Sequence, residues 1–147
     1  MIEFNYITYE LPDRKTLIAR PIINCSIINP ISNKGIYVAG ILDSGSDYIL
    51  MSRTLANYLD FKLDGQTTKQ ISGLGSSIPT ITCHAKFIFL GDSKHVLLNV
   101  PIEVCIDETD ETDETLESIQ IIFGRRGLFS EFDIEFKERE SKIIFQR

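Results

Sequence analysis

The sequence Ile41-Leu42-Asp43-Ser44-Gly45-Ser46 carries a carboxylate straight from an apolar strand into a tight loop of small residues. The backbone amides of Ser44, Gly45 and Ser46 are able to hydrogen-bond that carboxylate, and Gly45 has no side chain to keep a substrate backbone away. An Asp-Ser-Gly-Ser sequence after a strand is also an ordinary turn. The choice between a turn and a catalytic loop therefore depends on the rest of the chain.

On both sides of this loop, apolar and polar residues alternate, which predicts a mostly β chain. Residues 24–28 and 36–42 are expected to form a strand pair, joined by a turn that Asn29-Pro30 and Asn33-Lys34-Gly35 indicate. Further strands begin near Ile81, with His84 on the polar face, and near Val96. In the latter strand the even positions form the buried face, and the mixed odd positions include Glu103. Those even positions are Val96, Leu98, Val100, Ile102, Val104 and Ile106.

Helix is expected only in short pieces. Ser52 is a suitable cap for a short helix with Leu55, Ala56 and Leu59 on its buried side. A second short helix is predicted after Gly124, with Leu128, Phe129 and Phe132 directed inward. Residues 132–136 and 142–145 flank a polar tract and predict a C-terminal hairpin over 132–146.

The chain has 147 residues, a formal net charge of −6 and 43% hydrophobic residues. This profile predicts one soluble globular domain over 1–147. Its acidity argues against a nucleic-acid partner, and no apolar run reaches the ~20 residues needed to cross a membrane. No signal-peptide pattern is visible, and Cys25, Cys83 and Cys105 have neither disulfide nor zinc-site spacing. We therefore expect a cytoplasmic protein with buried free thiols.

Several familiar sites are absent from the sequence. It contains no nucleophile elbow, no phosphate-binding glycine loop and no zinc-binding helix motif, so no metal and no cofactor are predicted. Residues 107–117 hold three Asp-Glu-Thr repeats, which predict a solvated acidic loop. A calcium site is less favoured there because the glycine turn and the ligand spacing of a calcium loop are missing.

Two more features follow the Asp43 loop in order. A hairpin is predicted over 67–89 with a glycine-rich tip, and an apolar strand over 119–123 ends in Gly124-Arg125. This arrangement resembles the retropepsin-like (retroviral-type) aspartic proteases, and most closely their small bacterial members. The matching motifs span nearly the whole chain: Arg20-Pro21, Asp43-Ser44-Gly45-Ser46-Asp47, Leu55-Ala56, Gly73-Leu74-Gly75 and Gly124-Arg125-Arg126-Gly127-Leu128-Phe129.

The resemblance implies a retropepsin-like acid-protease barrel, with one lobe per chain and one or two short helices. It implies that Asp43 is the catalytic aspartate, supported by a loop of Ser44, Gly45 and Ser46. It further implies that Asp47 and Arg125 form a partly buried structural ion pair. The implied flap tip consists of Ser72, Gly73, Leu74, Gly75, Ser76 and Ser77.

The chain carries a single Asp-Ser-Gly motif, whereas this chemistry needs two carboxylates that share one proton. The resemblance therefore implies a homodimer in which Asp43 of both subunits activates a water to hydrolyse a peptide or protein substrate. The alternative is a catalytically inactive dimerisation or peptide-binding module, because a fold does not fix a function.

Overall fold

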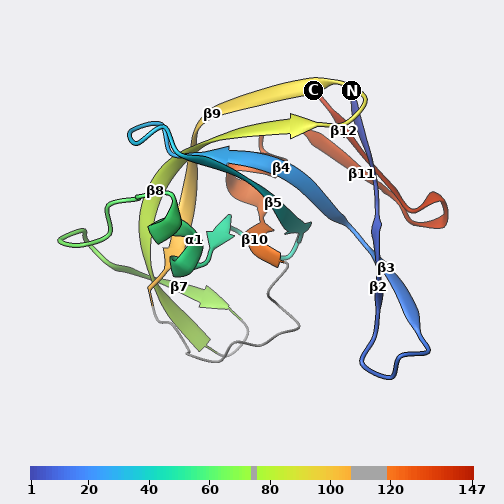
Figure 1. Ribbon diagram of the computed structural model, residues 1–147, viewed down its shortest axis with the longest axis horizontal. Helices are drawn as coiled ribbons and strands as arrows, with labels where there is room; N and C mark the ends of the chain where they lie inside the picture. The colour runs from blue at the N-terminus through green and yellow to red at the C-terminus, as the bar shows by residue number, and fades with distance from the viewer. Residues whose placement is uncertain (74–75, 107–118) are drawn as a thin grey trace.

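The computed structural model describes residues 1–73, 76–106 and 119–147 (Figure 1). The acidic repeats at 107–117, and Leu74 and Gly75 of the expected flap tip, lie outside the described residues. Strands make up 56% of the structure, which confirms the predicted mostly β class. The elements in chain order are β1 (Ile2–Asn5), β2 (Ile7–Glu10), β3 (Leu17–Arg20), β4 (Ile22–Ile28), β5 (Gly35–Leu42), β6 (Leu50–Met51), α1 (Arg53–Tyr58), β7 (Lys69–Gly73), β8 (Ser76–Leu90), β9 (Lys94–Cys105), β10 (Ile119–Phe123), η1 (Arg125–Phe129), β11 (Asp133–Lys137), η2 (Glu138–Glu140) and β12 (Lys142–Gln146).

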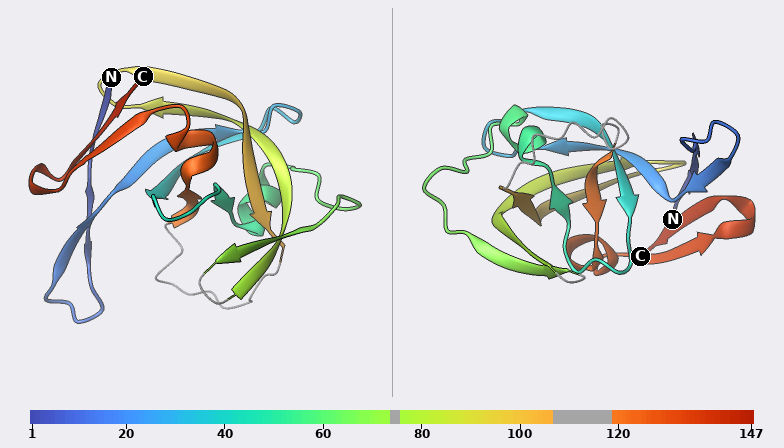
Figure 2. Two further views of the ribbon diagram at one scale, coloured as in Figure 1. Left: turned by 180° about the vertical axis from the view of Figure 1, so that it is seen from behind. Right: turned by 90° about the horizontal axis from the view of Figure 1, so that it is seen from below.

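Six strands close into a barrel in the order β4-β5-β10-β6-β9-β8, with β8 returning to pair with β4 (Figure 2). The strand β7 lies outside this closed set and extends the sheet beyond β8. Most neighbours are antiparallel, but β10 runs parallel to β5, and β6 runs parallel to β9. The ends of β5 and β10 therefore point the same way, which places the Asp43 loop beside Gly124.

The predicted strand pair forms as β4 and β5, with Cys25 opposite Val38. Alternate residues of β4 enter a core that also contains a cluster of phenylalanines. Phe87 and Phe123 meet edge to face with ring centroids 5.6 Å apart. A Cβ atom at Gly40 would overlap the ring of Phe123, so glycine at this position allows β5 and β10 to pack closely.

A bulge in β9 corrects the predicted buried face of that strand. Ala85 pairs with Val100, but Phe87 pairs with Leu97, so β9 carries one extra residue between the two pairs. Asn99 takes up the extra length with a φ of +52°. The alternation is reversed before this point, so that Leu98 is 70% exposed whereas Leu97 is only 4% exposed. The predicted inward positions of Leu98 and Val96 are therefore wrong. Val100, Ile102 and Val104 are buried as expected.

The helix predicted after Ser52 is α1. The Ser52 hydroxyl accepts a hydrogen bond from the Leu55 amide at 3.2 Å, and Leu55, Ala56 and Leu59 are buried. The second helical segment, η1, is a single distorted turn, because Arg126 has a ψ of 123° and Gly127 a φ of +95°. It still buries Leu128 and leads into buried Phe132, while Phe129 is partly buried. None of the helices in the described ranges is long and apolar enough to cross a membrane.

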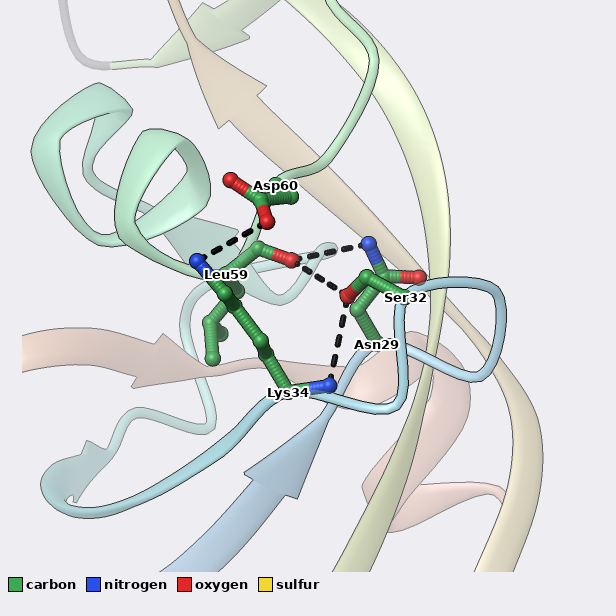
Figure 3. Close-up of polar contacts among 5 residues, drawn as sticks. All are labelled: Asn29, Ser32, Lys34, Leu59 and Asp60. Atoms are coloured by element: carbon green, nitrogen blue, oxygen red, sulfur yellow. Dashed lines mark hydrogen bonds and ion pairs between the residues drawn. The ribbon is translucent and has the colours of Figure 1, made fainter.

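The end of α1 is fastened to the turn between β4 and β5 (Figure 3). The carbonyl oxygen of Leu59 accepts hydrogen bonds from the side-chain amide of Asn29 and from the Ser32 hydroxyl, both at 2.9 Å. Lys34 and Asp60 add an ion pair of 2.9 Å in which both side chains are more than half exposed. The buried carbonyl of Leu59 at the helix end is satisfied in this way, which a helix terminus requires.

The two ends of the chain share a small sheet of order β1-β12-β11 (Figure 1). The predicted C-terminal hairpin forms there as β11 and β12, with Ile134 opposite Phe145. Phe145 also meets Phe4 of β1 edge to face, at a centroid distance of 5.1 Å. The hairpin of β2 and β3 extends away from the barrel.

Candidate active site

Asp43 lies directly after β5, at the point where β5 and β10 end side by side. Its backbone N–H donates to the carbonyl oxygen of Phe123 at 2.9 Å, and the preceding Leu42 N–H donates to the carbonyl of Pro21, also at 2.9 Å. The Arg20-Pro21 motif thus borders the loop on the β4 side. The Asp43 side chain is exposed in the single chain.

The loop after Asp43 folds back onto the carboxylate. The Gly45 N–H donates to Asp43 Oδ1 at 2.9 Å, and the Ser46 N–H donates to the Asp43 carbonyl at 3.1 Å. The Ser46 hydroxyl donates to the carbonyl of Tyr48 at 2.8 Å. Of the three loop amides expected to bind the carboxylate, that of Gly45 is hydrogen-bonded to it. It fixes the orientation of one carboxylate oxygen.

The segment after β10 supports this loop through its backbone. The Arg125 N–H donates to the carbonyl of Ser46 at 2.8 Å, and the Arg126 N–H donates to that of Asp47 at 2.9 Å. A Cβ atom at Gly124 would lie 2.6 Å from the Ser46 carbonyl oxygen and would overlap the carbonyl of Tyr48. Glycine is therefore required at position 124 for the two segments to approach.

Among the described residues of the single chain, Asp47 and Arg125 do not form the expected ion pair, which stays a prediction for the assembled protein. Instead, Arg125 Nη1 donates to the Ser44 carbonyl at 3.4 Å. Both residues are open to solvent in the single chain, where pairing of charged groups contributes little.

The predicted hairpin over 67–89 forms between β7 and the first part of β8. Ser72 pairs with Ser77 and Gly73 pairs with Ser76, so the two strands approach their tip in register. Beyond Thr80, β8 pairs with β9, and its far end also pairs with β4. Ser72, Ser76 and Ser77 are exposed. The role of this hairpin as a flap stays a prediction.

One charged residue near the site was not singled out by the sequence. Glu103 on β9 is only 2% exposed, and its carboxylate accepts hydrogen bonds from the hydroxyls of Thr80 at 2.9 Å and Thr82 at 3.0 Å. The ammonium of Lys69 in β7 forms an ion pair of 2.7 Å with the same carboxylate. One sequence signal could have identified Glu103: it is a carboxylate inside the apolar run 100–106, and a buried carboxylate needs hydrogen-bond or ion-pair partners.

The thiols are poor candidates for chemistry. Burial raises the pKa of Cys25 to about 12, and burial together with the Glu103 charge raises the pKa of Cys83 to about 11. Both groups are therefore protonated near neutral pH and weakly nucleophilic. His84 is exposed, as the alternation predicted. In the parts of the chain that the structure describes, His, Cys, Asp and Glu side chains form no group of three that could hold a metal ion.

No family model and no curated protein matches this sequence. Among solved structures, the chain is similar to a retropepsin-like aspartic protease from Rickettsia conorii, with a TM-score of 0.59 and 15% sequence identity. The similarity covers 97% of this chain and 89% of the other. At this level of identity the match shows the fold. The chain has a retropepsin-like barrel with a single lobe, as the sequence motifs predicted.

Proposed function

We propose that this protein is an aspartic endopeptidase that works as a homodimer. The observation that carries the proposal is the placement of Asp43: it is exposed at the end of β5, and one of its carboxylate oxygens is fixed by the Gly45 amide at 2.9 Å. A carboxylate that is oriented by the backbone and open to solvent is available to a water molecule and to a second carboxylate.

The chemistry requires a pair of carboxylates that share one proton. The ionised member takes a proton from the attacking water, while the protonated member donates a hydrogen bond to the carbonyl oxygen of the peptide bond. The only other Asp-Ser in the chain is Asp92-Ser93, and Asp92 is engaged elsewhere, accepting a hydrogen bond from the Glu3 amide at 3.1 Å. The second carboxylate therefore comes from Asp43 of another copy, across a two-fold axis.

The neighbouring residues take supporting roles in this proposal. Ser44 lies beneath the carboxylate pair and hydrogen-bonds across the dimer, while Gly45 leaves room for the substrate backbone. An extended peptide binds across the two-fold axis, and the β7–β8 hairpin closes over it as a flap and excludes water. The substrate is a peptide or protein, and no cofactor takes part. Three free cysteines support a cytoplasmic location.

The proposal is tested with the variant Asp43→Asn, which keeps the shape of the side chain and removes the shared proton. Cleavage of an unbiased peptide mixture is followed by mass spectrometry, and the solution mass by analytical ultracentrifugation. We expect the wild-type chain to cleave as a dimer and the variant to form the same dimer without cleaving. Cleavage that persists in Asp43→Asn would place the chemistry elsewhere.

Peptide binding measured on the same two forms identifies the alternative function of this fold. A dimerisation or peptide-binding module would cleave nothing in either form, and both forms would bind peptides from the mixture equally well. That outcome would replace the endopeptidase proposal with the binding module.

A further inference from the structure

Glu103 is a buried ionisable group that the proposed peptide hydrolysis does not use. Its neighbours in β9, Ile102 and Val104, point into the core, so Glu103 belongs to the opposite face of the strand. At 2% exposure it is unable to meet a substrate. A carboxylate in such a place is costly unless it is paired and hydrogen-bonded, so the contacts it makes are needed to keep it there.

Glu103 and its partners span three adjacent strands. Lys69 of β7 is opposite Thr80 of β8, and Thr82 of β8 is opposite Glu103 of β9. Directly opposed residues share a face of the sheet, so these four side chains form one cross-strand cluster. The hydroxyls of Thr80 and Thr82 and the ammonium of Lys69 all reach the same carboxylate.

The cluster also touches the segment that follows the Asp43 loop. The ammonium of Lys69 lies over the ring of Tyr48, 4.9 Å from its centroid, which is a cation–π contact. The carbonyl of Tyr48 in turn accepts the hydroxyl of Ser46 from the loop itself, at 2.8 Å. On the other side, the Glu103 N–H donates to the carbonyl of Ile49 at 2.8 Å.

The strand β7 needs such a contact because it is otherwise held along one edge. In the described part of the chain it is hydrogen-bonded to β8 and to no other strand. A single ladder fixes the register of the hairpin but allows it to twist and tilt against the barrel. Lys69 adds a second point of attachment, because its ammonium is bound both to β9 and to the Tyr48 ring.

We propose that Lys69 and Glu103 are positioning residues that set the β7–β8 hairpin against the segment following Asp43, with Tyr48 as the point of contact. This inference rests on the proposed function for its role in substrate binding. Neither residue takes part in bond breaking. The Glu103 carboxylate holds the Lys69 ammonium through the ion pair. Lys69, whose side chain is 39% exposed, also contacts the Tyr48 ring and so links the hairpin to the segment after Asp43.

Hydrogen exchange of the free, full-length chain tests the placement without any need for activity. In Lys69→Met, we expect the amides of 69–73 to exchange about tenfold faster, while those of β5 stay within about twofold of wild type. Lys69→Arg should restore slow exchange because it keeps the charge. The matched control is Lys34→Met, which breaks an ion pair of 2.9 Å between the β4–β5 turn and the end of α1.

A double variant guards against loss of folding. Lys69→Met leaves an unpaired buried carboxylate, whereas Lys69→Met with Glu103→Gln removes both charges and keeps an amide able to bond the threonines. The double variant should fold and still exchange fast over 69–73. Unchanged exchange there, or an equal rise throughout the barrel, would overturn the inference. So would a failure of Lys69→Arg to restore slow exchange.

Kinetics separate this role from that of Asp43. Lys69→Met should raise KM about tenfold with a smaller change in kcat, since the hairpin contributes to substrate binding, and Lys34→Met should change neither. A loss confined to kcat would contradict the positioning role. If the wild-type chain cleaves nothing, the endopeptidase proposal fails, while the exchange experiment still decides whether this pair positions the hairpin.

Discussion

Asp43 and Phe123 are joined by a backbone hydrogen bond of 2.9 Å from the Asp43 N–H to the Phe123 carbonyl. This bond connects the ends of two parallel strands, where Asp43 follows β5 and Gly124 follows β10. The exposed carboxylate is therefore attached directly to the buried core of the barrel, where Phe123 is fully covered. Preorganisation of this kind is what the catalytic role proposed for Asp43 needs.

Gly124→Ala should destabilise the protein by about 1 to 3 kcal/mol, because the added methyl group would overlap the carbonyls of Ser46 and Tyr48. Urea unfolding followed by circular dichroism measures the change. Gly65→Ala is the control: its Cβ would meet nothing within 4 Å, and only its φ of +74° costs energy, about 1 kcal/mol. A smaller effect at position 124 than at position 65 would contradict the close packing described here.

Arg125→Ala should cost less than about 1 kcal/mol, because the residue is exposed and the hydrogen bond from its side chain to the Ser44 carbonyl is long, at 3.4 Å. The family resemblance had implied a partly buried pair with Asp47, whose loss would cost about 3 to 5 kcal/mol. Urea unfolding of Arg125→Ala and of Asp47→Asn distinguishes the two cases. A loss as large as the buried pair implies would show that the two side chains do meet in the working protein.

His95 should make the fold sensitive to acid. Burial and the charge of Arg147 lower its pKa, the amino terminus acts in the same direction, and Glu131 opposes them. Its Nε2 atom is buried and has no hydrogen-bond partner in the described part of the chain. The unfolded chain takes up the proton first, near pH ~6.5, so the stability contributed by neutral His95 is present above that pH and is lost as the pH falls through the lowered pKa.

The test compares urea midpoints above and below that pH. The ring of His95 packs edge to face on Phe132 at 5.0 Å, so His95→Phe should keep the contact and reduce the loss of stability in acid. His84→Gln, at an exposed position, should lose stability in acid as the wild type does. An unchanged acid response in His95→Phe would assign the effect to other groups.

The proposed carboxylate pair makes a prediction about activity and pH. Two carboxylates that share a proton are competent only while the pair is singly protonated, so kcat/KM should rise and fall around an acidic maximum. Initial rates on one peptide substrate over the pH range in which the protein stays folded measure this profile. A maximum above neutral pH, or activity that depends on an added metal ion, would contradict the mechanism.

The sequence predicted the parts of the fold that depend on local pattern. The alternation in 24–28 and 36–42 was sufficient for β4 and β5, and the hydroxyl of Ser52 marked the start of α1. At Asn99 the same reasoning failed, because one inserted residue reverses every side chain before it and the pattern of Val96 and Leu98 contains no sign of a bulge.

In the candidate site, too, the local features were predictable from the sequence and the features that depend on distant residues were not. The Asp43 loop was predictable because the residues that orient the carboxylate are its immediate neighbours. Glu103 was not, because its partners are distant in sequence and meet it only through the register of β7, β8 and β9. Asp47 and Arg125 show the remaining difficulty: their segments do lie together, but a sequence does not show which way two side chains point.

The central claim is that Asp43 from two chains forms one catalytic pair, and subunit mixing tests it most directly. Wild-type chain is combined with Asp43→Asn at constant total concentration, allowed to exchange subunits, and assayed for peptide cleavage. If both carboxylates are required, activity should follow the square of the wild-type fraction, so that an equal mixture keeps about a quarter of the activity. Activity proportional to the wild-type fraction, with about half remaining in the equal mixture, would show that each chain works with its own Asp43 alone.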